Sequence, residues 1–333
     1  MLSENIDITT RHTFGIATTA RAWGEYASVD ELRNLLREVK RRNLEFMPIG
    51  EGSNLLFVRP YVGALLRSRI VTLQSLPTPD GRILVKAGSG WCWDEFVAHC
   101  VSQGWGGIEN LSHIPGTVGA SAVQNIGAYG VEVCDVIVSI EALDVDTLEV
   151  VEIDPANCEY GYRTSRFKGS WRGKYIVTSV TYALTLSHQL RLHYGNLRQR
   201  VGESPSLQDV RDAVIATRRE KLPEVCELGS AGSFFVNPII ERSHYDALLA
   251  KYPDMPCYEV DEKRVKVPAG WLIEHAGWKG KSVGGARVYE KQSLVIVNSG
   301  NATAAHVVQL ANDIAFSVFE TYQIIITREV NYI

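Results

Sequence analysis

The sequence predicts an α+β fold in which strands and helices are grouped and do not strictly alternate. Its 333 residues are 45% hydrophobic and 22% charged, which is typical of a globular protein with room for two or three domains. The stretch 131–186 contains period-two runs that indicate antiparallel strands. Capped segments of helical period lie on both sides of it. Because these elements form no regular βα series and no GxGxxG motif occurs, a Rossmann fold is disfavoured.

The first predicted elements form a helix, a strand, a loop and a second strand. Ser28 and Glu31 have the spacing of a capping box, and apolar residues recur on one face of the segment that follows. Strands are expected over 44–50 and 55–58, and the glycine-rich loop 50–54 joins them.

Further strands are expected over 83–87, 136–142, 148–153, 175–186 and 322–330. Helices are expected over 93–103, over 206–220, from about Pro268, and after a cap at Asn301 or Thr303. The segment "GSAGSFFVNP" (229–238) begins with residues too flexible for the interior of a helix or strand and then becomes strongly apolar. It therefore predicts a glycine hinge at the edge of a buried segment, with Ser233 at that edge.

Charge and hydropathy exclude several classes of protein. The formal net charge is -4 and no block of Lys and Arg is long enough to follow a phosphate backbone, so no nucleic acid partner is expected. The N-terminus "MLSENIDITTRHTF" is polar, unlike a signal peptide. No run of about 18 apolar residues occurs, so no membrane span is expected.

The cysteines and histidines are dispersed along the chain. Six cysteines form no CxxC pair, and eight histidines form no HxH or HExxH pattern. In a chain of this size the pattern predicts reduced thiols, a cytoplasmic protein and no metal site.

Two loops, 50–54 and 115–120, are candidate cradles for a nucleotide pyrophosphate. Such a group needs several backbone N–H groups directed at one point, and glycine permits the close approach. One loop of this kind is more often a tight turn, but two in one domain make phosphate binding an equal alternative. The candidate residues are Gly50, Gly52, Ser53, Asn54, Pro115, Gly116, Thr117, Gly119 and Ala120, followed by Asn125, Gly127 and Tyr129.

Motifs in a fixed order resemble the UDP-N-acetylenolpyruvoylglucosamine reductase family over nearly the whole chain. They are "IGEGSNLLF", "IPGTVGASAVQNIGAYG", "YGYRTSRFK", "GSAGSFFVNP", "VPAGWLIEHAGWKG" and "REV". The resemblance implies a two-lobed FAD-binding domain of the vanillyl-alcohol-oxidase (PCMH) type, with lobes over 1–68 and 69–218. It also implies a separate α+β substrate-binding domain over 219–320, while 321–333 returns near the active site.

The resemblance also implies an activity. The family uses non-covalently bound FAD and the co-substrate NADPH to reduce UDP-N-acetylglucosamine enolpyruvate to UDP-N-acetylmuramate, a cytoplasmic precursor of peptidoglycan. We therefore expect this substrate and NADPH as partners, with no nucleic acid and no membrane. A monomer is expected, although no residue pattern bears on the oligomeric state.

Functional residues can be transferred from the family motifs by position. The resemblance makes Arg163 the catalytic arginine, Ser233 the proton donor and Glu329 the catalytic glutamate. A guanidinium suits a substrate carboxylate that gains charge, and a serine hydroxyl can protonate a strongly basic enolate within hydrogen-bond reach. The residues that match family contacts to the nucleotide sugar are Tyr194, Lys221, Asn237 and Gln292.

Three positions depart from the family pattern. Glu51 adds a carboxylate in the first loop, His113 replaces a small residue, and Val236 replaces a frequent lysine. Two alternative functions remain open. A related oxidase with covalent flavin would hold the flavin through acid precipitation, and a nucleotide-sugar-binding protein without turnover would take up no FAD.

Overall fold

The computed structural model describes residues 1–187 and 189–333 and contains two compact units. Unit 1 comprises residues 1–6, 20–51 and 61–218, and unit 2 comprises residues 7–19, 52–60 and 219–333. Each unit has its own hydrophobic core. The second unit includes two short segments from the N-terminal part of the chain.

Unit 1 contains a four-stranded sheet that is covered by helix α1 (Val29–Arg41). The strand order is β1 (Ser3–Asp7), β2 (Thr19–Tyr26), β5 (Tyr61–Ser68) and β3 (Phe46–Ile49), and β5 runs parallel to both β2 and β3. The Ser28 hydroxyl accepts a hydrogen bond from the N–H of Glu31, which confirms the predicted cap. Four apolar residues of α1 are buried against the sheet, namely Leu32, Leu35, Leu36 and Val39.

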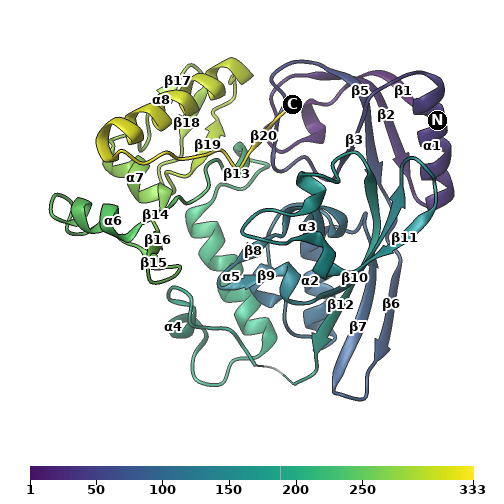
Figure 1. Cartoon of the computed structure of the whole chain (residues 1–333), viewed down its shortest axis with the longest axis horizontal. Coiled ribbons are helices and arrows are strands. Elements are labelled where there is room, and N and C mark those ends of the chain that lie inside the picture. Colours follow the sequence, from purple (N-terminus) through teal and green to yellow (C-terminus); the bar gives the residue numbers. More distant parts are fainter. Residues whose placement is uncertain (188) are drawn as a thin grey trace. The chain divides into compact units, whose positions relative to one another are not determined.

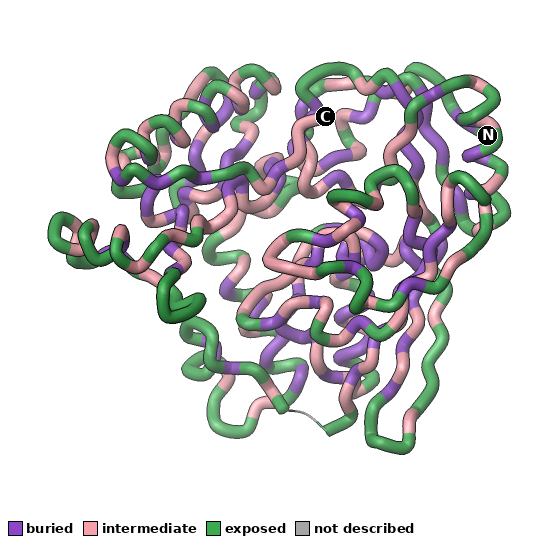
Figure 2. The backbone as a smooth tube through the Cα atoms, viewed as in Figure 1, coloured by how far each residue is buried: buried purple, intermediate pink, exposed green. Residues whose placement is uncertain are grey.

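A five-stranded antiparallel sheet is the larger sheet of unit 1 (Figure 1). Its order is β11 (Val150–Ile153), β10 (Ile137–Asp144), β12 (Tyr175–Thr185), β7 (Arg82–Gly88) and β6 (Leu73–Pro77). These strands confirm the expectations for 83–87, 136–142, 148–153 and 175–186. Figure 2 shows buried residues on the central strands and a mostly exposed β6 at the edge.

Helices of unit 1 position the candidate loops against this sheet. Helices α2 (Trp93–Ser102) and α3 (Val118–Gln124) share a core with the sheet strands (Figure 1). The hairpin of β8 (Gly127–Ala128) and β9 (Val131–Glu132) follows α3. Short 3-10 turns occupy Glu109–Leu111, Val133–Asp135, Pro155–Cys158 and Arg166–Lys168.

The last helices of this region are α4 (Leu197–Val201) and α5 (Leu207–Lys221). Helix α5 matches the prediction for 206–220. The Ser206 hydroxyl accepts a hydrogen bond from the N–H of Asp209 at 3.2 Å, and the Asp209 carboxylate accepts one from the Ser206 N–H at 2.8 Å. These reciprocal bonds satisfy amides at the helix start.

Unit 2 is built on two antiparallel sheets and three helices. One sheet has the order β13 (Gly229–Ser233), β19 (Val295–Asn298), β18 (Ala286–Val288) and β17 (Ser282–Val283). The other has β14 (Ile239–Glu241), β16 (Arg264–Lys266) and β15 (Tyr258–Glu259). The helices are α6 (Arg242–Leu249), α7 (Ala269–His275) and α8 (Ala304–Tyr322). The unit also contains the 3-10 turn Thr9–Arg11 and a parallel pair formed by β4 (Leu55–Leu56) and β20 (Asn331–Tyr332).

Helix α8 confirms the predicted cap and apolar stripe. The Thr303 hydroxyl accepts a hydrogen bond from the His306 N–H at 3.2 Å, so Thr303 and not Asn301 is the N-cap. The stripe of buried residues on this helix includes Val307, Leu310, Ile314 and Val318. They pack in the core of unit 2.

Two sequence predictions about unit 2 are wrong. The strand expected over 322–330 is absent from the described structure, because α8 continues to Tyr322 and only Asn331–Tyr332 forms a strand afterwards. The alternating burial of Ile324 and Ile326 comes from an extended segment that packs on the core. The segment Gly229–Ser233, expected to be too flexible for a strand interior, is strand β13.

All six cysteines carry free thiols. Within residues 1–187 and 189–333, no helix combines the length and the apolar character needed to cross a membrane. The same residues contain no group of three or more His, Cys, Asp or Glu side chains arranged to hold a metal ion.

Candidate active site

Ser233 ends strand β13 directly after a β-bulge. Strand β13 pairs with β19 at Ser230–Val297 and again at Ser233–Val295, so three steps on one strand match two on the other. Gly232 lies at this irregularity with a φ of 70°, and a Cβ built on it meets nothing within 4 Å. A bulge changes the direction of the side chain that follows it. The backbone beside the half-buried Ser233 is therefore open to an approaching ligand.

The strand that carries Ser233 is held firmly on its other side. A Cβ on Gly229 would lie 2.3 Å from the carbonyl oxygen of Phe14, so only glycine fits there. The Ser230 N–H donates to the carbonyl of Thr13 at 3.0 Å. After the bulge, Phe234 is fully buried in the core of unit 2. The glycine segment is thus a strand with one permitted irregularity.

Glu329 lies next to Ser233 in the hydrogen-bond network of unit 2. Its N–H donates to the carbonyl of Phe234 at 2.9 Å, and its carbonyl accepts a hydrogen bond from Asn54 Nδ2 at 3.3 Å. Arg328 forms a β-bridge with Phe235. The structure therefore brings together Ser233, Glu329 and Asn54, three residues from distant parts of the sequence.

Arg163 belongs to unit 1 and has an unusual backbone conformation. Its φ is 58°, in the left-handed region that non-glycine residues seldom adopt. Its Nη2 donates a hydrogen bond to the carbonyl of Gly127, and its Cζ lies 4.9 Å from the ring centroid of Tyr162. A Cβ on Gly127 would lie 2.9 Å from Arg163 Nη1. The guanidinium thus rests against a glycine of the predicted FAD loop.

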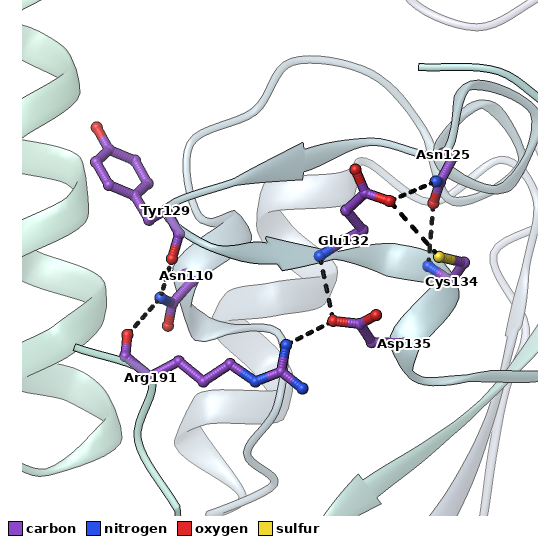
Figure 3. A network of polar contacts seen from close by, with 7 residues as sticks. All are labelled: Asn110, Asn125, Tyr129, Glu132, Cys134, Asp135 and Arg191. Atoms are coloured by element: carbon purple, nitrogen blue, oxygen red, sulfur yellow. Dashed lines mark hydrogen bonds and ion pairs between the residues drawn. The ribbon is translucent and has the colours of Figure 1, made fainter. Parts of the chain in front are cut away.

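Asn125 supports the turn that precedes Arg163. Its side chain is fully buried, and Nδ2 donates to the Glu132 carboxylate at 2.9 Å (Figure 3). The same Nδ2 donates to the Gly161 carbonyl at 3.0 Å. Its Oδ1 accepts from the Cys134 N–H at 3.2 Å. Both amide donors are engaged within the protein, so the Asn125 side chain acts as a scaffold for this turn.

The second predicted loop uses most of its backbone donors internally. The N–H of Gly116 donates to the Glu51 carboxylate at 2.7 Å, and that of Gly119 donates to the Ser89 carbonyl at 3.0 Å. The Ala120 N–H donates to the Thr117 hydroxyl at 3.3 Å, which is the N-cap bond of α3. The simple picture of a cradle made of free amides does not describe this loop. A phosphate would need donors from elsewhere as well.

The glycines of the first loop are required by close packing. A Cβ on Gly50 would lie 3.1 Å from Thr117 Oγ1, so the absence of a side chain at Gly50 lets the two predicted loops lie close together within unit 1. Gly52, in unit 2, has a φ of 66°, and its Cβ would lie 2.6 Å from His12 Cβ. Neither position can take a larger residue without a shift of its neighbours.

Arg218 supplies positive charge beside the second loop. Its Nε donates to the carbonyl of His113 at 3.1 Å, two residues before Pro115, and no described carboxylate forms an ion pair with it. Burial lowers the pKa of Arg218, although the nearby Tyr129 and Asp94 act in the opposite direction. A half-buried guanidinium that forms no direct ion pair with a described carboxylate suits an anionic group such as the diphosphate of a dinucleotide. The residues at this loop therefore fit FAD.

His113 has a backbone conformation that favours small residues. Its φ is 60°, and the Asp94 carboxylate accepts a hydrogen bond from its N–H. Asp94 also receives two hydrogen bonds from Arg211, at 2.6 and 2.9 Å. Burial acts to raise the pKa of Asp94, but the Arg211 guanidinium and the His113 N–H outweigh it and lower that pKa. This ion pair holds the start of the loop in a left-handed conformation.

The predicted substrate residues fall into separate places. Tyr194 is exposed in unit 1 and meets the ring of Tyr129 edge to face, with centroids 6.0 Å apart. In unit 2, Asn237 Oδ1 accepts from the Ala269 N–H at 2.9 Å and so caps α7. The amide oxygen of Gln292 accepts from the Leu294 N–H at 3.2 Å. Lys221, the last residue of α5, is exposed.

Comparisons with known proteins show the family to which this chain belongs. Two family models match the chain: an FAD binding domain over residues 23–154, and the C-terminal domain of UDP-N-acetylenolpyruvoylglucosamine reductase over residues 224–333. A UDP-N-acetylenolpyruvoylglucosamine reductase from Bacteroides fragilis is 46% identical over 334 residues, covering 100% of both chains. The chain belongs to the UDP-N-acetylenolpyruvoylglucosamine reductase family. The match extends along the whole sequence.

Other members of the UDP-N-acetylenolpyruvoylglucosamine reductase family also match this chain along nearly its whole length. The reductase from Neisseria meningitidis serogroup B is 42% identical over 332 residues, covering 98% of this chain and 96% of its own. The crystal structure of the Thermus caldophilus reductase superposes with a TM-score of 0.69 at 21% identity, covering 100% and 99% of the two chains. Together these findings confirm the predicted fold class, an FAD cofactor and an oxidoreductase.

Sequence reasoning missed two residues of unit 1 that lie beside the predicted FAD loops. Arg218 precedes Lys221 by three residues on the same helix, so the basic cluster near "RREKLP" was the available signal. Asn110 is fully buried and binds two distant backbone carbonyls. Nothing in the pattern around it predicts that role, because its partners lie 19 and 81 residues away.

Proposed function

We propose that this protein catalyses the NADPH-dependent reduction of UDP-N-acetylglucosamine enolpyruvate to UDP-N-acetylmuramate. Its membership of the reductase family supports the assignment of this substrate, and the match to an FAD binding domain supports the assignment of FAD as cofactor. Bound FAD would supply the chemistry of hydride transfer from NADPH to the vinyl carbon of the substrate. The protein must then stabilise an enolate and supply one proton.

Arg163 is proposed to bind the substrate carboxylate. Negative charge flows onto the carboxylate oxygens as the enolate forms, and a guanidinium donates two parallel hydrogen bonds to such a group. The support comes from its orientation, since Gly127 and Tyr162 hold the guanidinium from two sides. A preoriented cation stabilises developing charge without having to rearrange.

Ser233 is proposed to protonate the enolate carbon. The observation that carries this assignment is the bulge at Gly232, which gives Ser233 a different direction from the rest of β13 and leaves the adjacent backbone open. A hydroxyl is a weak acid, but an enolate is basic enough to take its proton at hydrogen-bond distance. Its conjugate base then regains a proton from solvent before the next turnover.

Glu329 is proposed to orient the reacting groups. Its backbone is hydrogen-bonded to Phe234, the residue after Ser233. A side chain anchored this close to the proton donor is suited to hold the substrate or the Ser233 hydroxyl in the reactive geometry. This is a positioning role, and Glu329→Gln should therefore retain part of it.

The test separates the two half-reactions. The purified enzyme is reduced with NADPH under anaerobic conditions, UDP-N-acetylglucosamine enolpyruvate is added, and flavin absorbance is followed by stopped flow. Ser233→Ala should leave reduction by NADPH nearly intact and slow reoxidation by about 10²–10⁴-fold, the usual contribution of a general acid. Equal damage to both half-reactions would refute the assignment of the proton donor.

Ser230→Ala is the matched control, because Ser230 lies on the same strand before the bulge and is buried. It should leave both half-reactions within about threefold of the wild type. Reduction of the wild type by NADPH without reoxidation by this substrate would indicate a different acceptor. A protein that takes up no FAD would contradict the proposal as a whole.

A further inference from the structure

Asn110 joins two functional segments of unit 1 through one side chain. Its Nδ2 donates to the carbonyl of Tyr129 at 2.9 Å and to the carbonyl of Arg191 at 2.8 Å (Figure 3). Tyr129 lies inside the FAD binding domain, which covers residues 23–154. Arg191 lies outside that domain, three residues before Tyr194. A single amide group thus spans the boundary between the cofactor region and a segment predicted to contact substrate.

The chemistry of this contact requires an uncharged primary amide. Both hydrogens of the NH₂ group are used, one for each carbonyl, and Asn110 is fully buried. A carboxylate would place negative charge against two carbonyl oxygens, and a hydroxyl could serve only one of them. Both acceptors are backbone carbonyls and stay in place when Asn110 is replaced. Loss of the two hydrogen bonds would therefore leave these carbonyls to find other donors. The orientation of the amide is fixed by these two acceptors.

The platform that carries Asn110 is rigid. It lies in the 3-10 turn Glu109–Leu111, where the Leu111 carbonyl accepts from Trp93 Nε1 at 2.9 Å and the Glu109 carbonyl accepts from the Ser112 hydroxyl at 2.6 Å. Glu109 and Leu111 are buried as well. Movement at either end of the contact must therefore be taken up by the segments and not by Asn110.

Both bound segments depend on more than this one contact. Tyr129 has a φ of 49°, a strained conformation that needs support from its surroundings. Its ring meets Tyr194 edge to face and packs beside a small core that includes the buried Leu192. Arg191 also pairs with Asp135 at 2.6 Å, although both side chains are well exposed. The exposed pair is worth little in water, so the buried amide is the stronger anchor.

We infer that Asn110 is a positioning residue that couples the occupancy of the FAD loop to the order of segment 191–194. FAD held against residues 126–130 fixes the Tyr129 carbonyl, and the same side chain then holds the Arg191 carbonyl in place. The segment that carries Tyr194 is thereby ordered before substrate arrives. This inference rests on the proposed function, in which Tyr129 contacts FAD and Tyr194 contacts substrate.

Hydrogen exchange measured by mass spectrometry tests the coupling directly. FAD should slow the exchange of amides 191–194 at least tenfold in the wild type. It should do so less than twofold in Asn110→Leu, which keeps the approximate volume but has no donor. Asn110→Ser, with one donor, should give an intermediate value. Equal protection in all three proteins would overturn the inference.

Asp135→Asn is the control, because it removes the charge that pairs with Arg191 while it keeps an acceptor for the Glu132 N–H. Its FAD-dependent protection should match the wild type, and a loss as large as in Asn110→Leu would overturn the role of the amide. A variant that no longer binds FAD is compared with the FAD-free wild type. In that comparison, amides 191–194 of the variant must exchange at least tenfold faster than those of the FAD-free wild type, while the exchange of amides 176–184 of β12 stays unchanged. Equal acceleration of the two segments would overturn the inference.

Kinetics connect the coupling to substrate. With FAD saturating, Asn110→Ser should raise the KM for the enolpyruvyl substrate about tenfold with a small change in kcat. In a Tyr194→Phe background it should add less than threefold, because both changes act through the same side chain. Full additivity would overturn the route through Tyr194. If the wild type does not reduce this substrate, the proposed function fails, while the exchange experiment with FAD still decides the coupling.

Discussion

Replacing Gly127 by alanine tests whether the position of the Arg163 guanidinium matters for catalysis apart from stability. A Cβ at Gly127 would lie 2.9 Å from Arg163 Nη1, whereas an ordinary contact begins at about 3.4 Å. The nitrogen must therefore move by roughly 0.5 Å, the difference between these values. This movement also disturbs the hydrogen bond from Nη2 to the Gly127 carbonyl.

The expected cost differs between folding and catalysis. The nearest atom is the end of a flexible side chain, and the next two, Glu132 Cγ and the Val131 carbonyl oxygen, each lie at 3.0 Å and require only a small shift. We expect a loss of roughly 1–2 kcal/mol in the free energy of unfolding. A displacement of about 1 Å at a positioning group costs about 10²-fold in rate, so a shift half as large predicts a loss of about 10–100-fold.

The assay is the reoxidation of reduced flavin by substrate, with FAD saturating and with thermal unfolding measured in parallel. Gly173→Ala is the matched control, because Gly173 has a φ of 77° and a Cβ there meets nothing within 4 Å. The left-handed conformation should cost it roughly 1–2 kcal/mol without touching Arg163. If Gly127→Ala slows reoxidation no more than Gly173→Ala does, the argument from guanidinium position is refuted.

Three other predictions concern the surroundings of the site. Asp94→Asn should destabilise the protein by about 3 kcal/mol at pH 7, because it leaves Arg211 buried without its charge partner. Since the folded pKa of Asp94 is lowered, its contribution is present above the unfolded pKa of about 3.9 and is lost as pH falls through the folded value. Urea unfolding from pH 3 to 7 should show a weaker acid dependence in the variant, and identical slopes would contradict the assignment. Gly229→Ala should prevent folding or cost more than about 3 kcal/mol, since its Cβ would lie 2.3 Å from the Phe14 carbonyl, and soluble, stable protein would show that this strand can shift. Glu51→Gln keeps an acceptor for the Gly116 N–H but removes a negative charge near the proposed diphosphate. FAD affinity measured by calorimetry should therefore rise about fivefold to tenfold at low salt and less at high salt. A fall in affinity would place the diphosphate elsewhere.

Local signals predicted the regular elements well. The cap at Ser28 and the apolar stripe of α8 correspond to helices because the face they define is buried in the structure. The period-two runs correspond to strands of the antiparallel sheet of unit 1. The strand expected over 322–330 failed for a physical reason. Alternating burial arises in any extended segment that lies on a core, and it does not require a neighbouring strand.

The site was less accessible to sequence reasoning. The glycines of 229–233 suggested flexibility, but Gly229 is needed for close packing against Phe14, and only Gly232 uses its conformational freedom. The glycines of the two loops suggested free amides, yet Gly116 and Gly119 donate within the protein. A sequence shows which residues could approach a ligand. It does not show which donors the protein has already used.

The composition of unit 2 has a consequence for how the chain is made. Thr13 and Phe14 bind residues of β13 and β19 that lie 217 and 284 positions further along. During synthesis these N-terminal residues emerge first but meet their partners only when nearly the whole polypeptide has left the ribosome. Unit 2 therefore cannot complete its sheet co-translationally, and a fragment that starts at residue 219 would expose the edge of β13. Such an edge invites pairing between chains, so that fragment should aggregate where the full chain folds.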